Sequence, residues 1–156
     1  MGSRAKRDAD QELDMSLAFT HLGTGSRGNA TLVESGDAKV LIDQGFSGKQ
    51  LETRLARMDI RPQEIDAIVL THHHGDHGGG ASIAQRRWDI PIYCNDRTAT
   101  ALNLDLRNVH LFESLEALDF ADDLALLPVP VPHSGADNVA FIASHRGERG
   151  AVITDL

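Results

Sequence analysis

Short apolar segments separated by turn residues run through most of the chain and predict a mixed α/β fold. The first segments are rich in β-branched residues and predict a meander of strands. Later strands alternate with stretches in which apolar residues recur at helical spacing. The predicted strands span 17–22, 30–34, 39–42, 65–70, 90–93, 109–112, 139–144 and 151–154, and the predicted helices span 47–58, 79–87 and 96–104.

Two of these segments carry the clearest local signals. Ser47 and Gln50 form a capping-box pattern, and Leu51 and Leu55 follow at helical spacing, so a helix is expected to begin at Ser47. Residues 65–70 are almost continuously apolar, which is typical of a strand buried on both faces. The last two predicted strands, 139–144 and 151–154, are expected to form a hairpin.

Composition narrows the class of protein. The chain has 156 residues, 41% of them hydrophobic and 24% charged, which is typical of one globular domain. We expect this domain to span 15–156 and residues 1–14 to form a disordered polar leader. No apolar run is long enough for a membrane span, and the leader is too polar for a secretory signal, so a cytoplasmic protein without a membrane partner is expected.

Charge and cysteine content exclude further classes. The single cysteine, Cys94, can form neither an internal disulfide nor a thiolate zinc site with a second cysteine. The formal net charge of −8 argues against a general polyanion-binding surface, although it says nothing about local patches.

A cluster of imidazoles and a carboxylate directly follows the buried strand at 65–70, in the order His72, His74, Asp76 and His77. These groups are ligands for Zn²⁺ and neighbouring divalent ions, and alternate residues that leave a strand point the same way, so His72 and His74 can share a metal. Asp76 and His77 lie on the turn into the next helix and can face a second metal. A purification tag would be terminal and uninterrupted, so the pattern favours metal binding over a tag or a chance cluster.

Further ligands must come from elsewhere, because a catalytic site needs about three protein ligands for each metal. His133 ends a further predicted strand, PVPVPH, before a Ser-Gly turn, and Asp155 ends the predicted strand AVITD. Each thus lies at a strand terminus, where loops gather. Either residue taken alone could equally be an ordinary turn residue.

The chain contains, in this order, LGTGSRGNATLVE, VLIDQGFSGKQLETRL, IDAIVLTHHHGDHGGG, IPIYC, PVPHSGADNVAFI and VITDL. Together they resemble the metallo-β-lactamase fold and, more narrowly, its YycJ/WalJ type of nucleases and phosphodiesterases. The resemblance runs from about Met15 to Leu156. The HxHxDH motif is specific for the superfamily, whereas the GS-x-GNA loop and the SGK-x-L helix indicate the subgroup less specifically. The fold implied is an αββα sandwich that binds two divalent metal ions, with zinc expected and manganese or iron as alternatives.

The resemblance also implies a role for each site residue. The implied ligands are His72, His74 and His133 for one metal, Asp76 and His77 for the other, and Asp155 bridging the two. Asp76 is the expected catalytic residue, which orients the attacking water or takes its proton. Two departures matter: Ser134 stands where the family has an aspartate, and the family continues past the bridging aspartate with more strands, a helix and a last histidine ligand. The sandwich is therefore expected to be incomplete at the C-terminus, or its second metal site weakened.

The reaction implied is metal-dependent cleavage of phosphodiester bonds in DNA or RNA, of exonuclease type, with nucleic acid as the partner. One alternative is a hydrolase of small esters, thioesters, lactams or cyclic phosphodiesters. A di-iron oxygen-reducing protein would have a carboxylate in the place of His74. The remaining alternative is an inactive fragment that binds one metal or none. An incomplete sandwich would also expose apolar sheet surface, so self-association is expected.

The loop Gly23–Gly28 fits the pattern GxGxxG, and Asp43 follows Gly23 by twenty residues. A dinucleotide site would need a helix after the third glycine, whereas the sequence there predicts a hairpin. The resemblance instead places this loop and Asn29 near the metals, where Arg27 can meet a substrate phosphate; a tight turn alone is the alternative. Asp43 is expected to orient the His-rich loop, with a simple turn cap as the alternative.

The other histidines are expected to have no part in the site. His73 has the wrong parity and is predicted to point away from the metals. His21, His110 and His145 are scattered along the chain and are interpreted as ordinary surface or strand residues.

Overall fold

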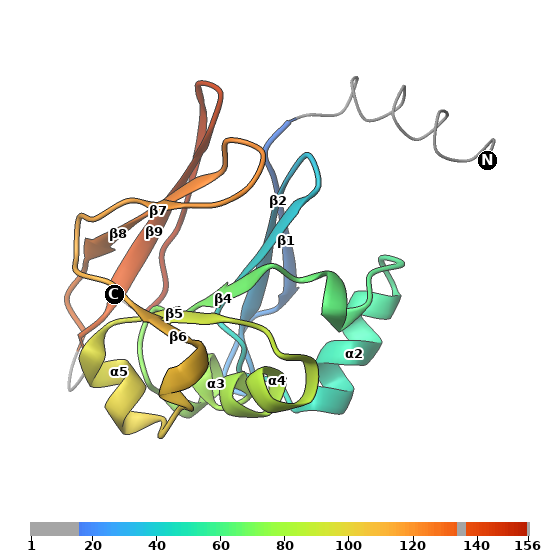
Figure 1. The fold of residues 1–156 in the computed structure, drawn as a ribbon, viewed down its shortest axis with the longest axis vertical. Helices are drawn as coiled ribbons and strands as arrows, with labels where there is room; N and C mark the ends of the chain where they lie inside the picture. Colours follow the sequence, from blue (N-terminus) through green and yellow to red (C-terminus); the bar gives the residue numbers. More distant parts are fainter. Residues whose placement is uncertain (1–15, 134–136, 156) are drawn as a thin grey trace.

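A computed structural model describes residues 16–133 and 137–155, which form two sheets and a set of helices (Figure 1). In spatial order the first sheet contains β1 (Ala18–Gly23), β2 (Ala30–Ser35), β3 (Ala38–Ile42), β4 (Ala67–Val69), β5 (Ile92–Cys94) and β6 (Val109–Leu111). The second sheet contains β10 (Glu148–Val152), β9 (Val139–His145), β8 (Ala125–Pro130) and β7 (Leu118–Asp119). The helices are α2 (Gly48–Ala56), α3 (Gly75–Gly78), α4 (Ala81–Trp88) and α5 (Asp96–Ala101), with 3₁₀ turns η1 (Pro62–Glu64) and η2 (Leu106–Asn108).

The first sheet changes direction halfway across. Strands β1, β2 and β3 are antiparallel neighbours, whereas β3 to β6 are parallel and are joined by helical crossovers. The carboxyl ends of β3, β4 and β5 therefore meet at one edge, which is where polar residues collect in open α/β sheets. The second sheet is antiparallel throughout.

Strand alternation divides the core between two interfaces. Leu41 of β3 and Ile68 of β4 face the helices, where they join a buried cluster with Leu51 of α2. Their neighbours Val40 and Val69 face the second sheet and pack in the other buried cluster. As the sequence predicts, β4 is buried on both faces. Figure 1 shows the described helices on one side of the first sheet and the second sheet on the other.

The helix signals in the sequence are confirmed. Ser47 caps α2, and its reciprocal capping box with Gln50 is present. Asn95 caps α5 by accepting a hydrogen bond from the backbone N–H of Thr98. Helix α5 ends at Ala101, three residues before the predicted end.

The C-terminal hairpin corrects one prediction. Strand β10 spans Glu148–Val152 rather than 151–154, and Glu148 pairs with His145 across a two-residue turn. The central turn residues Arg146 and Gly147 both have positive φ, the geometry that matches the twist of a hairpin. The residues after the turn are polar because they belong to an exposed edge strand. Their polarity therefore predicts a loop rather than the start of a strand. The short strand β7 was also missed, since its two residues lie in an acidic stretch.

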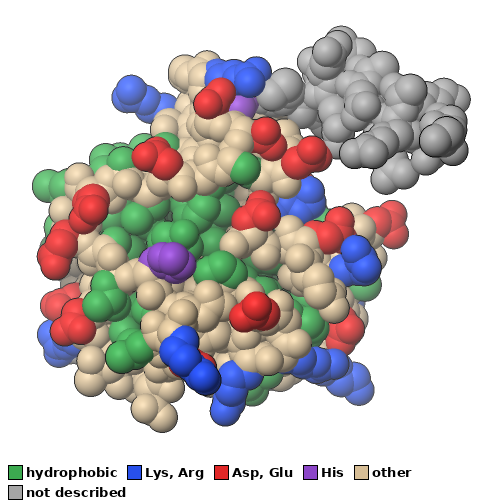
Figure 2. All heavy atoms as spheres, viewed as in Figure 1, with side chains coloured by type: hydrophobic (Ala, Val, Ile, Leu, Met, Phe, Trp, Pro, Cys, Tyr) green, Lys and Arg blue, Asp and Glu red, His purple; other side chains and the backbone are tan. Residues whose placement is uncertain are grey.

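The described residues form helix, sheet and sheet layers of the predicted αββα sandwich. The leader predicted at 1–14 and the turn at Ser134 lie outside the described residues. In the described part of the chain, no helix combines the length and the apolar composition that crossing a bilayer requires. Figure 2 shows apolar side chains at the surface between the two sheets on one face, and Leu111 and Leu115 are among the exposed large apolar residues. Self-association through such surface stays a prediction, which light scattering would test.

Candidate metal centre

The His-rich segment leaves the carboxyl end of β4 and turns into the single turn of α3. His74 is the N-cap residue of α3, and Asp76 and His77 lie within it. Beside it, the chain leaving β3 reaches Asp43, whose backbone N–H donates to Val69 O at 2.8 Å and whose φ is +66°. The end of β3 and the end of β4 are therefore held against each other at the position of the motif.

Asp43 is the centre of a buried hydrogen-bond network. Its carboxylate accepts from the backbone N–H of Thr71 at 2.8 Å, from the Thr71 hydroxyl at 2.8 Å and from His77 Nδ1 at 2.7 Å. Thr71 Oγ1 also lies 2.8 Å from His72 Nδ1. These contacts agree with the orienting role predicted for Asp43. The sequence analysis does not identify Thr71, although Thr71 directly precedes the His-rich motif.

This network sets which nitrogen of each ring is free. A carboxylate only accepts, so Nδ1 of His77 carries the hydrogen given to Asp43. The single hydroxyl hydrogen of Thr71 also goes to Asp43, so Thr71 Oγ1 accepts from Nδ1 of His72. His72 is thereby left with an Nε2 lone pair, the state in which imidazole binds a metal, whereas Nε2 of His77 lies 2.8 Å from the Asp155 carboxylate.

The pKa values follow from burial and from neighbouring charges. Burial raises the pKa of Asp43, although its hydrogen bonds to His77 and Thr71 oppose the rise. Burial also disfavours the charged form of His77, but the Asp43 carboxylate, together with Asp155 and Asp76, raises the pKa of that ring. Burial, followed by the charges of His77 and His74, lowers the pKa of His72 to about 4. His72 is therefore neutral near pH 7, as a metal ligand must be.

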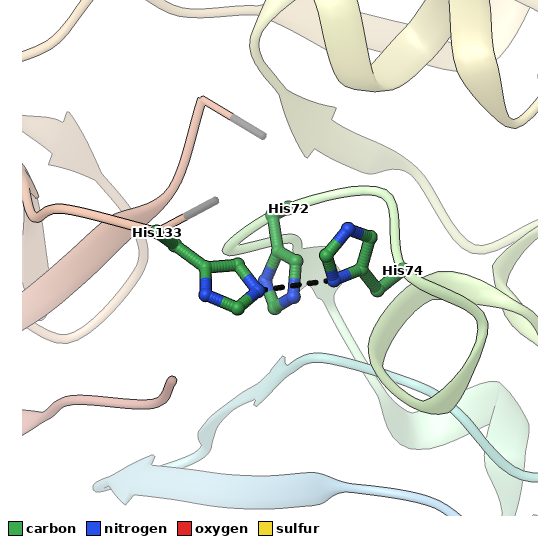
Figure 3. A group of neighbouring side chains, drawn as sticks. All are labelled: His72, His74 and His133. Atoms are coloured by element: carbon green, nitrogen blue, oxygen red, sulfur yellow. Dashed lines mark hydrogen bonds between the residues drawn. The ribbon is translucent and has the colours of Figure 1, made fainter. Parts of the chain in front are cut away.

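His72, His74 and His133 form the first group of converging ligand atoms, all within 4.8 Å of one another. His133 Nε2 lies 3.0 Å from His74 Nδ1, and Figure 3 shows the three rings with nitrogen atoms turned toward one another. His133 follows the end of β8 by three residues, so the second sheet supplies this donor. Three imidazoles are a donor set that suits Zn²⁺.

His72, His77 and Asp155 form the second group. Asp155 Oδ2 lies 2.8 Å from His77 Nε2 and 3.3 Å from His72 Nε2. Asn138 Nδ2 donates to the backbone carbonyls of Thr154 at 2.9 Å and Asp155 at 3.3 Å, which positions this loop after β10. The carboxylate thus lies beside the ring that both groups share.

Asp76 lies at the margin of this arrangement. Its Oδ2 is 3.5 Å from His77 Nε2, and it accepts a hydrogen bond of 3.3 Å from Asn29 Nδ2. The same amide nitrogen is 3.3 Å from His77 Nε2 and donates to the Asp76 backbone carbonyl at 3.0 Å. Asp76 belongs to neither group of converging ligand atoms. The assignment of Asp76 as a ligand, like those of the other five residues, stays a prediction.

One buried atom indicates directly that these side chains suit a bound cation. Nε2 of His72 is buried and has no hydrogen-bond partner in the described part of the chain. A buried polar atom without a partner is costly, and this one faces the other imidazole nitrogens and the Asp155 carboxylate. His73, His21, His110 and His145 belong to neither group.

The metallo-beta-lactamase superfamily model matches residues 23–149. The chain is 31% identical over 116 residues to exodeoxyribonuclease WalJ of Streptococcus pneumoniae, covering 70% of this chain and 43% of that protein. It is 29% identical over 146 residues to exodeoxyribonuclease YycJ of Bacillus anthracis, covering 90% and 55%. It is also 44% identical over 106 residues to a hydroxyacylglutathione hydrolase of Serratia proteamaculans, covering 67% and 38%.

The chain thus spans about half the length of these curated relatives. Among solved structures, the subclass B3 metallo-beta-lactamase BJP-1 of Bradyrhizobium japonicum superimposes with a TM-score of 0.71 at 14% identity, covering 88% of this chain and 59% of that one. The fold implies divalent metal ions, and the His cluster suits them. Because the family model matches most of the chain and the structure has the same fold, the chain belongs to the metallo-β-lactamase superfamily.

Proposed function

We propose that this chain carries the metal centre of a hydrolase that cleaves phosphodiester bonds in nucleic acid, with an exonuclease mode of action. The observation that carries the proposal is the convergence of two groups of ligand atoms on His72. Two divalent ions a few Å apart are the arrangement that serves in-line displacement at phosphorus. The names of the WalJ and YycJ relatives support nucleic acid as the substrate.

The residues of the chain would divide the work by position. His72, His74 and His133 would hold one ion, and His77 and Asp155, with Asp76 beside them, would surround the place for a second. Bound ions would lower the pKa of a coordinated water and neutralise charge on the phosphoryl oxygens.

Asp76 is the group best placed to handle a proton. Its side chain is one-third exposed and lies beside His77 Nε2, whereas Asp43 is fully occupied inside the network. Asn29 fixes the Asp76 carboxylate by its hydrogen bond. Asp76 would thus orient an attacking water and accept its proton, and Asn29 would keep the carboxylate aimed at the site.

The proposal is tested by metal titration together with cleavage assays on the same chain. We expect two equivalents of Zn²⁺ or Mn²⁺ to bind and to support release of nucleotides from the end of a labelled single-stranded oligodeoxynucleotide. Excess chelator is expected to stop this release. Asp76→Asn is expected to lower the turnover rate by about 100-fold, since positioned proton transfer contributes about that much. Loss of the second equivalent of metal in this variant would identify Asp76 as a ligand, whereas retention of both would identify it as the proton acceptor alone.

Parallel assays separate the alternatives. Hydrolysis of a glutathione thioester or of a β-lactam without any oligonucleotide cleavage would replace the proposal with the small-substrate alternative. One equivalent of metal without turnover of any substrate would support the inactive fragment. Cleavage that continues in excess chelator would contradict a metal-dependent reaction.

A further inference from the structure

One face of helix α2 forms a basic concavity outside the metal centre. Its volume is about 210 Å³, and it is lined by Lys49, Gln50, Thr53, Arg54 and Arg57. These are three cations and two neutral polar residues, with no carboxylate among them. We call this surface the α2 groove.

The cations of the α2 groove differ from most others on the molecule. Elsewhere, ion pairs join Lys39 to Glu34, Arg61 to Glu64, Arg87 to Glu52, Arg97 to Asp137, Arg107 to Asp105 and Arg146 to Asp123. Within residues 16–133 and 137–155, Lys49, Arg54 and Arg57 form no ion pair with a carboxylate. In a chain of net charge −8, this groove therefore gathers three cations with no carboxylate in its lining.

Arg54 connects the α2 groove to the loop that borders the metal centre. Its guanidinium donates to the carbonyl of Leu22 and lies 4.2 Å above the centre of the Phe46 ring. The same ring packs so closely against Gly28 that a Cβ there would lie 2.6 Å from it. Gly28 directly precedes Asn29, which contacts Asp76 and His77. A short series of contacts thus runs from the centre to the groove.

The opposite side of the centre has a different charge. A pocket of about 380 Å³ beside His133 is lined by Glu113 and Asp137, with no lysine or arginine in its lining. The nearby Arg97 is paired with Asp137 at 3.3 Å. A polyanion that leaves the metal centre beside His133 would meet Glu113 and no cation of this lining, whereas Figure 1 shows α2, which carries the groove, at the opposite end of the helix layer from α5.

We infer that the α2 groove binds a backbone phosphate of the nucleic-acid substrate away from the bond that is cleaved. The inference rests on the proposed function. Lys49 and Arg57, which form no ion pair with a carboxylate in the described part of the chain, suit a phosphate group, and each such contact adds a salt-dependent contribution to affinity. The groove thereby sets the direction in which the strand runs from the centre, over the loop at Gly28 and toward α2.

The test measures binding of a labelled phosphorothioate-linked single-stranded oligodeoxynucleotide to the metal-loaded chain by fluorescence anisotropy at several salt concentrations. The test variant is Lys49→Ala/Arg57→Ala, in which both side chains are exposed, so folding should be preserved. Loss of one phosphate contact would reduce the slope of log K against log salt by about 0.7. We expect this reduction and an affinity about tenfold lower. The matched control is Arg61→Ala/Arg107→Ala, which removes two ion-paired surface cations and should change neither quantity.

The outcomes separate this inference from the proposed function. Equal affinity and equal salt slope for the test variant and the unaltered chain would overturn the inference and leave the proposed function standing. Failure of the unaltered chain to bind the oligonucleotide would overturn both. Inorganic phosphate distinguishes a nucleic-acid phosphate from a free anion as the ligand of the groove. If inorganic phosphate saturates the groove and the salt slope for the oligonucleotide is the same in the test variant and the unaltered chain, the groove binds a free anion and the inference is overturned. Weak competition by inorganic phosphate, with the slope reduced in the test variant, would support it.

Discussion

The two halves of the metal centre are built in different ways. The half supplied by the first sheet carries His72 and His77, whose side chains are 0% and 2% exposed and whose Nδ1 atoms are held by Thr71 and Asp43. The half supplied by the second sheet carries His133 and Asp155, which lie on loops beyond β8 and β10. The Asp155 side chain is 38% exposed, and the residue has a φ of +52°.

This difference indicates a division of roles. The first-sheet half has its tautomers and ring positions set by buried hydrogen bonds before any ion binds, which lowers the cost of ordering the site. The second-sheet half completes both groups of ligand atoms from loops that the protein can change without disturbing its core. Loss of a first-sheet residue should therefore affect metal binding and folding together, whereas loss of a second-sheet residue should affect metal binding alone.

The largest effect on metal binding is expected from His72→Ala, because Nε2 of His72 is the buried donor of the first group and lies 3.3 Å from Asp155 of the second. The first group would retain two donors, too few for a stable zinc site. We expect the affinity for Zn²⁺ at the first position to fall by roughly 100-fold or more, and cleavage to be abolished. Competition with a chromophoric chelator measures this loss. His110→Ala, which removes an imidazole stacked on Tyr93, is the matched control, and two tightly held equivalents in His72→Ala would contradict His72 as a ligand of the first ion.

Asp43→Ala should have the largest effect on folding. It leaves the ring N–H of His77 and the backbone N–H of Thr71 without their buried acceptor. Removing one partner of such a network costs about 3 kcal/mol of the free energy of unfolding. Urea unfolding of the metal-free chain measures this cost. Asp76→Ala removes a partly exposed carboxylate from α3 and should cost less than about 1 kcal/mol. Equal losses for the two variants would show that burial of Asp43 does not stabilise the fold.

The second-sheet half should show the opposite behaviour. Asp155→Ala is expected to lose the second metal first, and His133→Ala to weaken the first site while one equivalent remains bound to the other group. Each affinity should fall by about 10-fold to 100-fold, while the free energy of unfolding changes by less than about 1 kcal/mol, since these loops add little to the core. Metal analysis after dialysis and urea unfolding provide the two measurements. A large loss of stability in His133→Ala would place that residue in the structural core instead.

The same division explains how much of the site the sequence could predict. The spacing of His72, His74 and His77 is local, so one strand end and one turn were enough to predict their proximity. His133 lies 59 residues after His74, and its contact depends on the packing of two sheets. Proximity of His133 and Asp155 to the motif was therefore expected mainly from the resemblance to a known family, because each residue taken alone was also compatible with an ordinary turn.

Other features could not be predicted because they depend on three-dimensional pairing. The hydroxyl of Thr71 acquires its role only when β3 places Asp43 beside it, and no periodicity marks that contact. The start of β10 at Glu148 depends on positive φ values in the preceding turn, where only one of the two residues is glycine. The strands and helices with strong patterns, such as α2 and β4, needed no such information and were predicted within a few residues.

The smallest effect concerns Cys94, which ends β5 in the first sheet and tests how closed that half of the molecule is. Burial, with a smaller contribution from the charge of Asp96, raises the pKa of this thiol from 9.0 to about 12. At a given pH below 9 this reduces the thiolate fraction by about a thousandfold, and the thiolate is the reactive form. A disulfide reagent at pH 8 should therefore label the folded chain slowly and the urea-unfolded chain at once.

Because the thiol of Cys94 keeps its proton in the folded state and loses it more readily when unfolded, its contribution to stability should decline as pH rises above about 9. Cys94→Ala provides the baseline for that measurement. Rapid labelling of the folded, metal-loaded chain would mean that the end of β5 opens, and the contrast between a closed first-sheet half and an adaptable second-sheet half would then fail at the strand next to the His-rich turn.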